Sequence, residues 1–331
     1  MKTDQFKPAW WLPNPHFQTL WPPIFRRRVK SLRLERERLE LPDGDFIDLD
    51  WVNRHQVGPL VLILHGLEGS IESHYAKGML KTLSQQGWRG VFMHFRGCSG
   101  EPNRLQRGYH SGDTGDVSYV ARVLLEREPH TPLAAIGYSL GGNVLLKWLG
   151  ETRYQNPLKA AIAISVPFEL HKAANRIQKG FSKFYEWYFI RCLRDRLTTK
   201  FQANAIPLDL SILHEVRTMH EFDDKVTAPL HGFSGVDEYY TTSSSRQYLS
   251  TIEVPTLILH AKDDPFMTED MIPQGHELSP KVKLELTETG GHVGFVAGKF
   301  PWRPEYWLEK RVPLFLRDYI RGHENSLLNN F

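Results

Sequence analysis

The chain has 331 residues, enough for one large α/β domain with an insertion or for two ordinary domains. Lys and Arg outnumber Asp and Glu by 41 to 38, and a net charge of +3 on a chain of this size argues against nucleic-acid binding. The two cysteines, Cys98 and Cys192, cannot form a disulfide framework and are not grouped with histidines at zinc-ligand spacing. We therefore expect reduced thiols in a cytoplasmic protein that holds no metal.

The sequence gives no sign of a membrane-spanning segment. The longest strongly apolar run, residues 60–64, is far shorter than the ~20 residues that span a bilayer. Residues 1–15 lack the apolar core of a secretory signal. We therefore expect neither secretion by that route nor stable membrane insertion.

Residues 1–30 are unusual because prolines and aromatic residues are interleaved along them. The aromatic residues are Trp10, Trp11, Phe17, Trp21 and Phe25. Because proline disrupts helix interiors and central strands, we expect an extended arm. Such an arm could contact lipid or cover a pocket. Exposed aromatic patches are uncommon, so we favour an arm that packs on its own domain.

Two separated stretches, residues 31–166 and 247–322, carry the pattern of an α/β core, and residues 323–331 are expected to form a polar tail. Residues 32–51 alternate between apolar and polar side chains around a turn signature at residues 42–45, which predicts an antiparallel hairpin. Later segments are apolar at almost every position, as expected of strands covered on both faces. These segments are residues 60–64, 90–93, 133–136, 160–164 and 256–259, followed by a more alternating strand at 282–286.

Helical patterns separate these strands. They cover about residues 73–86, 115–127, 140–150 and 304–320. Strands and helices in this order predict an eight-stranded, mostly parallel sheet with helices on both faces. The alternation stops at residues 167–246, which are rich in helix formers and aromatic residues. We therefore predict a helical cap inserted into the α/β frame.

The motif Gly137-Tyr138-Ser139-Leu140-Gly141 fits the pattern G-x-S-x-G. The pattern alone is weak, but here it directly follows a buried strand and directly precedes a helix. That setting is typical of a nucleophile elbow, in which a tight and strained turn exposes the serine. The helix N-terminus behind it favours developing negative charge. Ser139 is therefore the candidate nucleophile.

A serine hydroxyl needs a general base near neutral pH. In the elbow arrangement the chain order is serine, acid, histidine, so the base should come late. His292 follows two glycines in the loop after the last strand, where the imidazole can be laid over the elbow. His276 precedes that strand and His323 lies in the polar tail, so both are less suitable. We therefore expect His292 to be the base.

The acid should follow the preceding strand, where Asp263 and Asp264 stand side by side. We prefer Asp264 because it directly precedes Pro265, where the loop bends. Asp263 would then cap or hydrogen-bond within the loop. Asp223 and Asp224 are also in the required chain order, but they fall in the cap and are better explained by a solvated turn or a helix-cap contact.

Two backbone N–H groups should stabilise the oxyanion of an acyl-transfer reaction. One is expected at Leu140, the residue after the nucleophile. The other should come from the loop after the third strand, where Gly66 lets the backbone turn close to the substrate and Leu67 is the expected donor. In neighbouring loops, His65 is better explained as a brace than as a base, and Arg96 as a partner in a structural ion pair.

Several motifs occur together and in order. They are NPHFQTLWP at residues 14–22, HG-x-x-G at 65–69, FRGCSG at 95–100, YHSGDTGD at 109–116, GYSLGGN at 137–143, DDP at 263–265 and GGHVGF at 290–295. They resemble the branch of the α/β-hydrolase superfamily that contains the bacterial hydrolase YheT and the eukaryotic α/β-hydrolase-domain lipases. The resemblance covers about residues 10–320 and implies the α/β-hydrolase fold and esterase or lipase-like activity, with the triad on Ser139, Asp264 and His292. Eukaryotic relatives often carry a membrane anchor ahead of this region, and we expect none here.

We therefore expect a serine esterase that cleaves carboxylic esters of small molecules through an acyl-enzyme on Ser139. The aromatic cap suits an apolar, lipid-like acyl chain, although those aromatic residues could equally be packing. No metal or organic cofactor is expected, since the sequence has no phosphate loop, H-E-x-x-H or dinucleotide motif. An acyltransferase or thioesterase using the same triad remains an alternative. A non-catalytic lipid-binding scaffold is another, although an intact triad argues against it.

Overall fold

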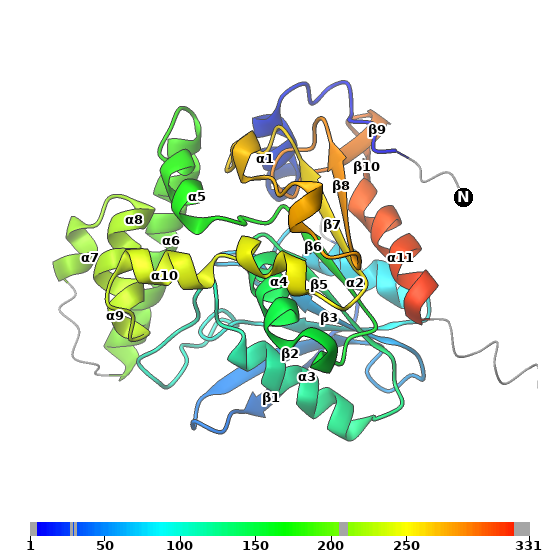
Figure 1. The fold of residues 1–331 in the computed structure, drawn as a ribbon, viewed down its shortest axis with the longest axis horizontal. Helices are drawn as coiled ribbons and strands as arrows, with labels where there is room; N and C mark the ends of the chain where they lie inside the picture. Colours follow the sequence, from blue (N-terminus) through cyan, green and yellow to red (C-terminus); the bar gives the residue numbers. More distant parts are fainter. Residues whose placement is uncertain (1–4, 27–28, 30–31, 205–210, 321–331) are drawn as a thin grey trace, which may run out of the picture.

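The computed structural model describes residues 5–26, 29, 32–204 and 211–320, so the predicted polar tail at 323–331 lies outside the described residues. Figure 1 shows a central sheet with helices on both sides and a further group of helices at one end of the molecule. This layered arrangement confirms the predicted α/β class.

One eight-stranded sheet runs through the molecule in the order β1-β2-β4-β3-β5-β6-β7-β8. Its strands are β1 (Glu35–Glu40), β2 (Phe46–Val52), β3 (Leu60–Leu64), β4 (Arg89–Met93), β5 (Leu133–Tyr138), β6 (Ala160–Ile164), β7 (Thr256–Ala261) and β8 (Val282–Thr287). Neighbouring strands from β4 to β8 pair in parallel, whereas β2 runs antiparallel to both β1 and β4. The predicted eight-stranded, mostly parallel sheet and the first hairpin are therefore confirmed.

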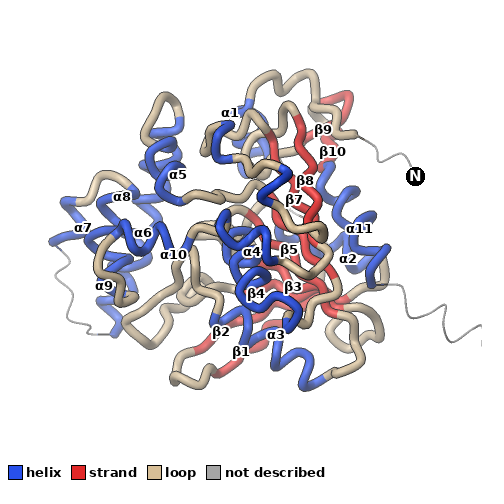
Figure 2. Tube along the Cα trace, viewed as in Figure 1, coloured by secondary structure: helices blue, strands red, loops and turns tan. Residues whose placement is uncertain are grey.

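Helices cover both faces of this sheet, as Figure 2 shows. The flanking helices are α2 (Ala76–Gln85), α3 (Gly115–Arg127), α4 (Leu140–Thr152) and α11 (Trp307–Ile320). In β3, Leu62 and Leu64 belong to the core shared with α3 and α4, whereas Val61 and Ile63 belong to the core shared with α2 and α11. Successive side chains of a strand point to opposite faces, so a strand that is apolar at every position is buried on both.

Between β6 and β7 the described residues form helices and no strand. These helices are α5 (Leu170–Ile177), α6 (Ser182–Asn204), α7 (Ser211–Glu215), α8 (Met219–Phe222), α9 (Ala228–Leu230) and α10 (Val236–Ser243), with a π-helical turn at Asp223–Thr227. Figure 2 shows them grouped beside the sheet. They form two small apolar clusters, one that includes Leu193, Leu197 and Val226 and another that includes Leu170, Ala174 and Tyr239. We refer to residues 167–246, the range expected from the sequence, as the cap.

The extended arm predicted at residues 1–30 is wrong for its central part, where helix α1 (Pro15–Phe25) forms. The positions of its prolines explain why the helix is tolerated. Pro15 stands in the first turn, where a backbone N–H has no acceptor within the helix, and the Asn14 side chain caps that end. The two prolines inside the helix lie in its last turn, so they remove few hydrogen bonds.

Part of this segment packs on its own domain, as we expected. The buried Gln18 side chain donates to the carbonyl oxygen of Val296 at 3.0 Å and accepts the Val296 N–H at 2.8 Å. Ala9 and Leu12 pack on the same valine. Trp10, in contrast, stays exposed. Packing on the domain is therefore confirmed for Ala9, Leu12 and Gln18.

The helix predicted at residues 304–320 begins later than expected. A hairpin of β9 (Val296–Phe300) and β10 (Arg303–Tyr306) precedes α11, which starts at Trp307. The pairing of β10 is irregular between Arg303 and Glu305, which places Pro304 at a bulge where no N–H is needed. Proline at a helix start and proline at a strand bulge look alike in sequence, which explains the error.

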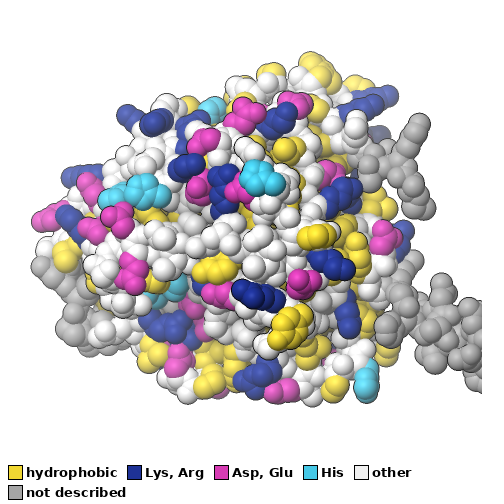
Figure 3. Space-filling model, in the orientation of Figure 1, with side chains coloured by type: hydrophobic (Ala, Val, Ile, Leu, Met, Phe, Trp, Pro, Cys, Tyr) yellow, Lys and Arg dark blue, Asp and Glu magenta, His cyan; other side chains and the backbone are white. Residues whose placement is uncertain are grey.

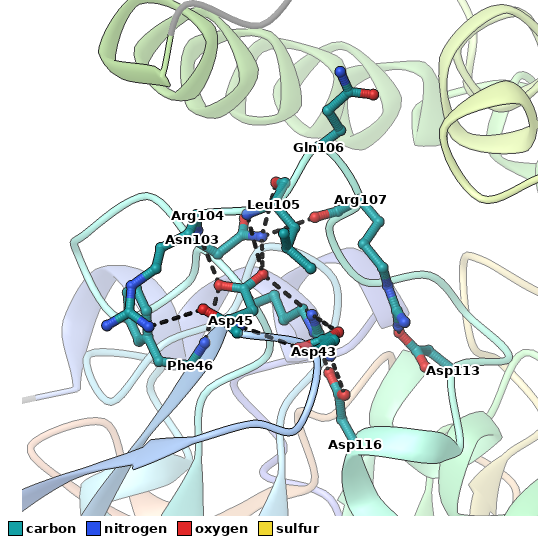
Figure 4. Close-up of polar contacts among 12 residues, drawn as sticks. Asp43, Asp45, Phe46, Asn103, Arg104, Leu105, Gln106, Arg107, Asp113 and Asp116 are labelled. Carbon is teal, nitrogen blue, oxygen red and sulfur yellow. Dashed lines mark hydrogen bonds and ion pairs between the residues drawn. The ribbon is translucent and has the colours of Figure 1, made fainter.

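Figure 4 shows a polar network around Asp45 that holds the loop at residues 103–107. The Asp45 carboxylate accepts hydrogen bonds from the Asn103 amide at 2.6 Å and from the Arg96 guanidinium at 3.1 Å. Arg96 is buried and also pairs with Asp116 at 2.6 Å. The structural ion pair expected for Arg96 is confirmed, and Arg96 also holds Asp45, which binds the loop at residues 103–107.

Candidate active site

Ser139 lies in the sharp turn between β5 and α4, at the carboxyl end of the sheet. Its backbone angles are φ 51° and ψ −118°, a conformation that residues with side chains rarely adopt. The Ser139 N–H donates to the carbonyl oxygen of Ile164 in β6 at 2.8 Å, which holds the turn against the neighbouring strand. The strained strand–turn–helix geometry expected from the sequence is present.

The glycines on either side of Ser139 are required by close backbone contacts. A Cβ at Gly137 would lie 2.4 Å from the carbonyl oxygen of Gly141, and a Cβ at Gly141 would lie 2.5 Å from that of His65. Both distances are far below van der Waals contact, so a side chain at either position would force the turn open. A third close approach is made by Gly66, whose Cβ would lie 3.2 Å from that of Ser139.

The structure brings Ser139, His292 and Asp264 together from the ends of three strands. The Nε2 atom of His292 lies 2.9 Å from the Ser139 Oγ, and the Nδ1 atom lies 2.8 Å from the Asp264 Oδ2. An ionised carboxylate can only accept, so Nδ1 carries the hydrogen and Nε2 is free to accept the hydroxyl proton. The three side chains form one continuous hydrogen-bonded chain.

The Asp264 carboxylate is buried beneath the imidazole. Burial by itself raises a carboxyl pKa, but the charge and hydrogen bond of His292, together with the Phe266 N–H at 2.9 Å, hold the pKa of Asp264 below its ordinary value. Asp264 is therefore ionised near neutral pH and can orient the imidazole. Asp263 has a different partner, since its Oδ1 accepts the Gly291 N–H at 2.9 Å.

Three contacts that were not expected from the sequence hold the His292 loop. The Thr19 hydroxyl of α1 accepts the His292 N–H at 2.9 Å, and the Ser165 hydroxyl accepts the Val293 N–H at 3.0 Å. The Phe266 ring stacks on the imidazole with 4.1 Å between ring centroids. No local pattern links Thr19 or Ser165 to His292. The place of Phe266, two residues after Asp264, is a local signal that could have found it.

The two residues expected to supply the oxyanion donors, Leu67 and Leu140, line the same cavity as Ser139. The N–H groups flanking Leu67 are engaged, because Gly66 donates to the Tyr75 hydroxyl at 2.9 Å and Glu68 donates to the Tyr109 hydroxyl at 2.8 Å. Within the part of the chain that the structure describes, the Leu67 N–H has no acceptor. The Leu140 N–H stands in the first turn of α4, where no acceptor exists within the helix. Both N–H groups are thus available to a substrate oxygen.

A partly buried ion pair ties this loop to the cap. The Nε atom of Arg196, on α6, lies 2.9 Å and 3.0 Å from the two carboxylate oxygens of Glu68. The Tyr109 hydroxyl also donates to the Glu68 carboxylate at 2.8 Å. Glu68 itself has φ 52°, so its side chain helps to hold an uncommon backbone conformation directly after Leu67.

His65 acts as the brace that we expected. Its Nε2 accepts the Phe95 N–H at 3.0 Å, and its Nδ1 lies 2.7 Å from the carbonyl oxygen of Gly66. Burial lowers the pKa of His65 to about 3, so the ring is neutral near neutral pH and can fill both roles. The ring therefore joins the loop after β3 to the loop after β4.

A cavity of about 1070 Å³, partly open to solvent, extends from Ser139 and His292 into the cap. Its lining is mainly apolar. The apolar members include Leu67, Leu170, Ala174, Ile177, Phe189, Leu193, Leu197, Phe222, Val226 and Phe266. Pockets that bind apolar ligands are lined in this way, with a few polar groups that fix orientation.

Asp223 is one of the polar groups in this lining, so its interpretation as a solvated turn is wrong. The side chain is buried and accepts hydrogen bonds from the Tyr240 and Thr227 hydroxyls, both at 2.7 Å. Burial raises the pKa of Asp223 to about 6. Asp224 does make the helix-cap contact that we expected, because it accepts the Val236 N–H at 3.2 Å.

Outside these residues, few side chains in the described part of the chain are arranged for metal binding or nucleophilic attack. No three His, Cys, Asp or Glu side chains among them are grouped so as to hold a metal ion. Cys98 and Cys192 are free thiols, and burial raises the pKa of Cys98 to about 12. Among the helices that the structure describes, none has the length and apolar character needed to cross a bilayer.

Comparisons with known proteins agree with this fold. A family model described as "alpha/beta hydrolase fold" matches residues 59–299. The Escherichia coli (strain K12) protein named "Putative esterase YheT" is 45% identical over 323 residues, which cover 96% of this chain and 94% of that protein. Phospholipase ABHD3 of Bos taurus is 29% identical over 335 residues, which cover 98% of this chain and 81% of that protein. The solved Pyrococcus furiosus esterase Pf2001 shares the fold, with a TM-score of 0.57, 18% identity, and coverage of 88% of this chain and 94% of that structure.

Proposed function

Because this chain belongs to the alpha/beta hydrolase fold family, we propose that it is a carboxylic ester hydrolase that acts through an acyl-enzyme on Ser139. The observation that carries the proposal is the hydrogen-bonded chain from Asp264 through His292 to the Ser139 hydroxyl. Two of its relatives carry the names of ester-cleaving enzymes, which supports ester substrates. A shared fold does not by itself establish activity, so the proposal depends on the side chains of Ser139, His292 and Asp264.

In the first half of the reaction, Ser139 Oγ attacks the ester carbonyl carbon while His292 Nε2 takes the hydroxyl proton. The carbonyl oxygen becomes negatively charged and accepts hydrogen bonds from the Leu67 and Leu140 N–H groups. The ester C–O bond then breaks, and protonated His292 gives its proton to the departing alkoxide. The products are the free alcohol and an acyl group bonded to Ser139.

In the second half, His292 takes a proton from a water molecule as the water oxygen attacks the acyl carbon. The bond to Ser139 Oγ breaks, His292 returns the proton to the serine, and the carboxylic acid leaves. Asp264 stays ionised throughout and stabilises the imidazolium that forms twice in each cycle. The proton exchanged between Ser139 and His292 passes between atoms that lie 2.9 Å apart.

The cavity supports an apolar acyl chain as part of the substrate. Its wall next to Ser139 is built from aliphatic and aromatic side chains of α5, α6 and the loop after β7. Each methylene of an acyl chain that leaves water for such a wall contributes roughly 0.8 kcal/mol. An acyl chain of moderate length therefore binds better than an acetyl group. This binding supplies selectivity among esters, because the reacting atoms are the same in all of them.

The nucleophile is tested by labelling with a fluorophosphonate probe. The wild type should be labelled and Ser139→Ala should not. Ser111→Ala is the matched control, since Ser111 lines the same cavity but lies outside the hydrogen-bonded chain. Equal labelling of wild type and Ser139→Ala would overturn the proposal. Nitrophenyl esters of increasing acyl length then test the cavity, and adding an alcohol acceptor separates hydrolysis from acyl transfer by the products formed.

A further inference from the structure

The first turns of α6, together with Phe181 directly before the helix, expose a cluster of large aromatic side chains. Phe181, Phe184, Trp187 and Tyr188 are 53, 48, 56 and 53% exposed. Their spacing of three and four residues places them on one side of the helix, whereas Ile190, Leu193 and Leu197 are buried in the cap core. We call these four aromatic residues the aromatic face of α6. Exposed apolar clusters of this kind mark surfaces that contact a partner or a membrane.

Ring contacts connect the aromatic face to the candidate active site. The Phe181 ring lies 5.9 Å from that of Tyr185, and Tyr185 lies 4.8 Å from Phe266. Phe266 lines the cavity and stacks on His292. On the next turn, Tyr188 contacts Phe189, which also lines the cavity. The aromatic face therefore borders the wall of the cavity that lies next to the catalytic histidine.

Basic side chains lie directly beside the aromatic face. Lys183, Arg191, Arg194 and Arg217 line a surface groove together with Trp187, and the Arg191 guanidinium lies 5.9 Å from the Trp187 ring. Glu186 is the one acidic residue in that lining; it is buried, and its carboxylate accepts the Met219 N–H at 2.9 Å.

Few carboxylates neutralise the basic side chains of this groove. Among the described residues, neither Lys183 nor Arg217 has a carboxylate within ion-pair distance, and Arg191 has only an exposed contact of 3.8 Å with Asp195. On the face drawn in Figure 3, in contrast, basic and acidic side chains are interspersed.

We propose that α6 docks on the surface of an anionic phospholipid bilayer. The aromatic face would enter the boundary between headgroups and acyl chains, where rings with a polar edge are favoured. The lysine and arginine side chains of the groove would contact lipid phosphates of an anionic surface. The exposed aromatic rings and the basic side chains beside them favour an anionic lipid surface over a folded protein partner.

Docking in this position would bring the cavity wall at Phe189 and Phe266 to the membrane, so that a lipid ester could pass from the bilayer to Ser139. That consequence rests on the proposed esterase function, but docking itself does not. Binding is therefore measured on Ser139→Ala, whose catalytic state has no influence on the result.

The test is co-sedimentation of Ser139→Ala with phosphatidylcholine vesicles, with and without phosphatidylglycerol. We expect binding to the anionic vesicles that weakens as salt is raised. In the same background, Phe184→Ser with Trp187→Ser, or Lys183→Gln with Arg191→Gln, should weaken binding about tenfold or more. The matched aromatic control is Phe300→Ser with Trp302→Ser, an exposed ring pair on the β9–β10 hairpin. It should bind like its parent, and an unchanged unfolding midpoint confirms that each variant is folded.

Three results would overturn the docking surface. One is absence of binding to anionic vesicles. Another is binding that survives both pairs of α6 changes or is lost in the hairpin control. The third is self-association through α6 without lipid, seen by analytical ultracentrifugation and removed by the aromatic changes, because the face would then be covered by a second copy of the chain. None of these results bears on Ser139, whose role is decided by probe labelling.

Discussion

Asp263 and Asp264 are adjacent in the chain but hold different atoms of the same histidine loop. The Asp264 carboxylate lies 2.8 Å from the imidazole of His292, whereas the Asp263 carboxylate accepts the backbone N–H of Gly291 at 2.9 Å. One aspartate therefore sets the protonation and orientation of the ring, and the other sets the path of the backbone that carries it. Mutating each aspartate separately therefore tests the two roles.

Asp264→Asn should lower kcat by about a thousandfold or more, because an amide cannot stabilise the imidazolium and favours the wrong ring tautomer. Asp263→Asn keeps an oxygen that can accept the Gly291 N–H, so its activity should stay within about tenfold of wild type. Initial rates with a nitrophenyl ester measure both variants. Similar losses in the two would refute the assignment of Asp264 as the orienting acid.

The Glu68–Arg196 ion pair predicts that the cap controls the oxyanion loop. Arg196→Met removes the cation that holds Glu68, so the Leu67 N–H should lose its alignment and kcat should fall about tenfold, with a smaller change in KM. Arg122→Met, which removes an exposed Arg–Glu pair on α3, should leave both constants near wild type. An unchanged kcat in Arg196→Met would show that the loop holds itself.

Gly141→Ala should destabilise the fold, since the added Cβ would lie 2.5 Å from the carbonyl oxygen of His65 and 2.6 Å from that of Leu64. Overpacking of this kind costs about 1–3 kcal/mol or more. Gly275→Ala is the control, because no atom lies within 4 Å of its Cβ position. Urea unfolding gives the free energy of unfolding for both, and equal values would contradict the packing argument.

Ala174→Trp should shorten the preferred acyl chain. Ala174 is buried on α5 and lines the cavity, so a large side chain there fills space that a long acyl group would occupy. The ratio of kcat/KM for long over short nitrophenyl esters should fall about tenfold. Asn175→Trp, on the exposed side of the same helix, should keep the wild-type ratio. A long-chain preference that persists in Ala174→Trp would place the acyl chain elsewhere.

Lys200 predicts a pH-dependent stability. Its Nζ donates to the carbonyl oxygens of Gln106 and Arg107 at 2.8 and 2.9 Å, and burial, followed by the charge of Arg196, lowers its pKa from 10.5 to about 7. Between these two values the unfolded chain binds a proton that the folded chain lacks. The free energy of unfolding should therefore rise with pH across this window.

Lys200→Met isolates this contribution. The difference in unfolding free energy between wild type and Lys200→Met should shift in favour of the wild type by a few kcal/mol as pH rises from about 7 to about 10. Urea unfolding at several pH values measures it. Parallel pH curves for the two proteins would mean that Lys200 stays protonated in the folded state.

Local pattern was enough to locate the sheet and the candidate nucleophile. The run at residues 60–64 is apolar at every position, and β3 occupies the same residues. The glycines around Ser139 stand in a turn where the neighbouring backbone leaves no room for side chains at those positions. The motif and its setting therefore predict the strained backbone of Ser139. Asp264 and His292 were expected because the chain order of the elbow arrangement places the acid and the base in loops after later strands.

Contacts between distant segments could not be predicted from local sequence patterns. The bond from Thr19 to the His292 N–H spans 273 residues, and the bond between Glu68 and Arg196 spans 128. Either pair is determined by the packing of whole elements, which no window of sequence contains. The helix at Pro15–Phe25 was missed for another reason, because proline is read as a helix breaker even where its missing N–H costs nothing.

The Thr19 hydroxyl also makes the histidine loop dependent on the amino-terminal end of the chain. A protease that clipped away α1 would leave nucleophile, acid and base in the polypeptide and would spare the sheet. The loop would nevertheless lose the anchor on its backbone and the Gln18 bonds to Val296 close by. Removal of α1 would thus abolish activity while the overall fold was still intact.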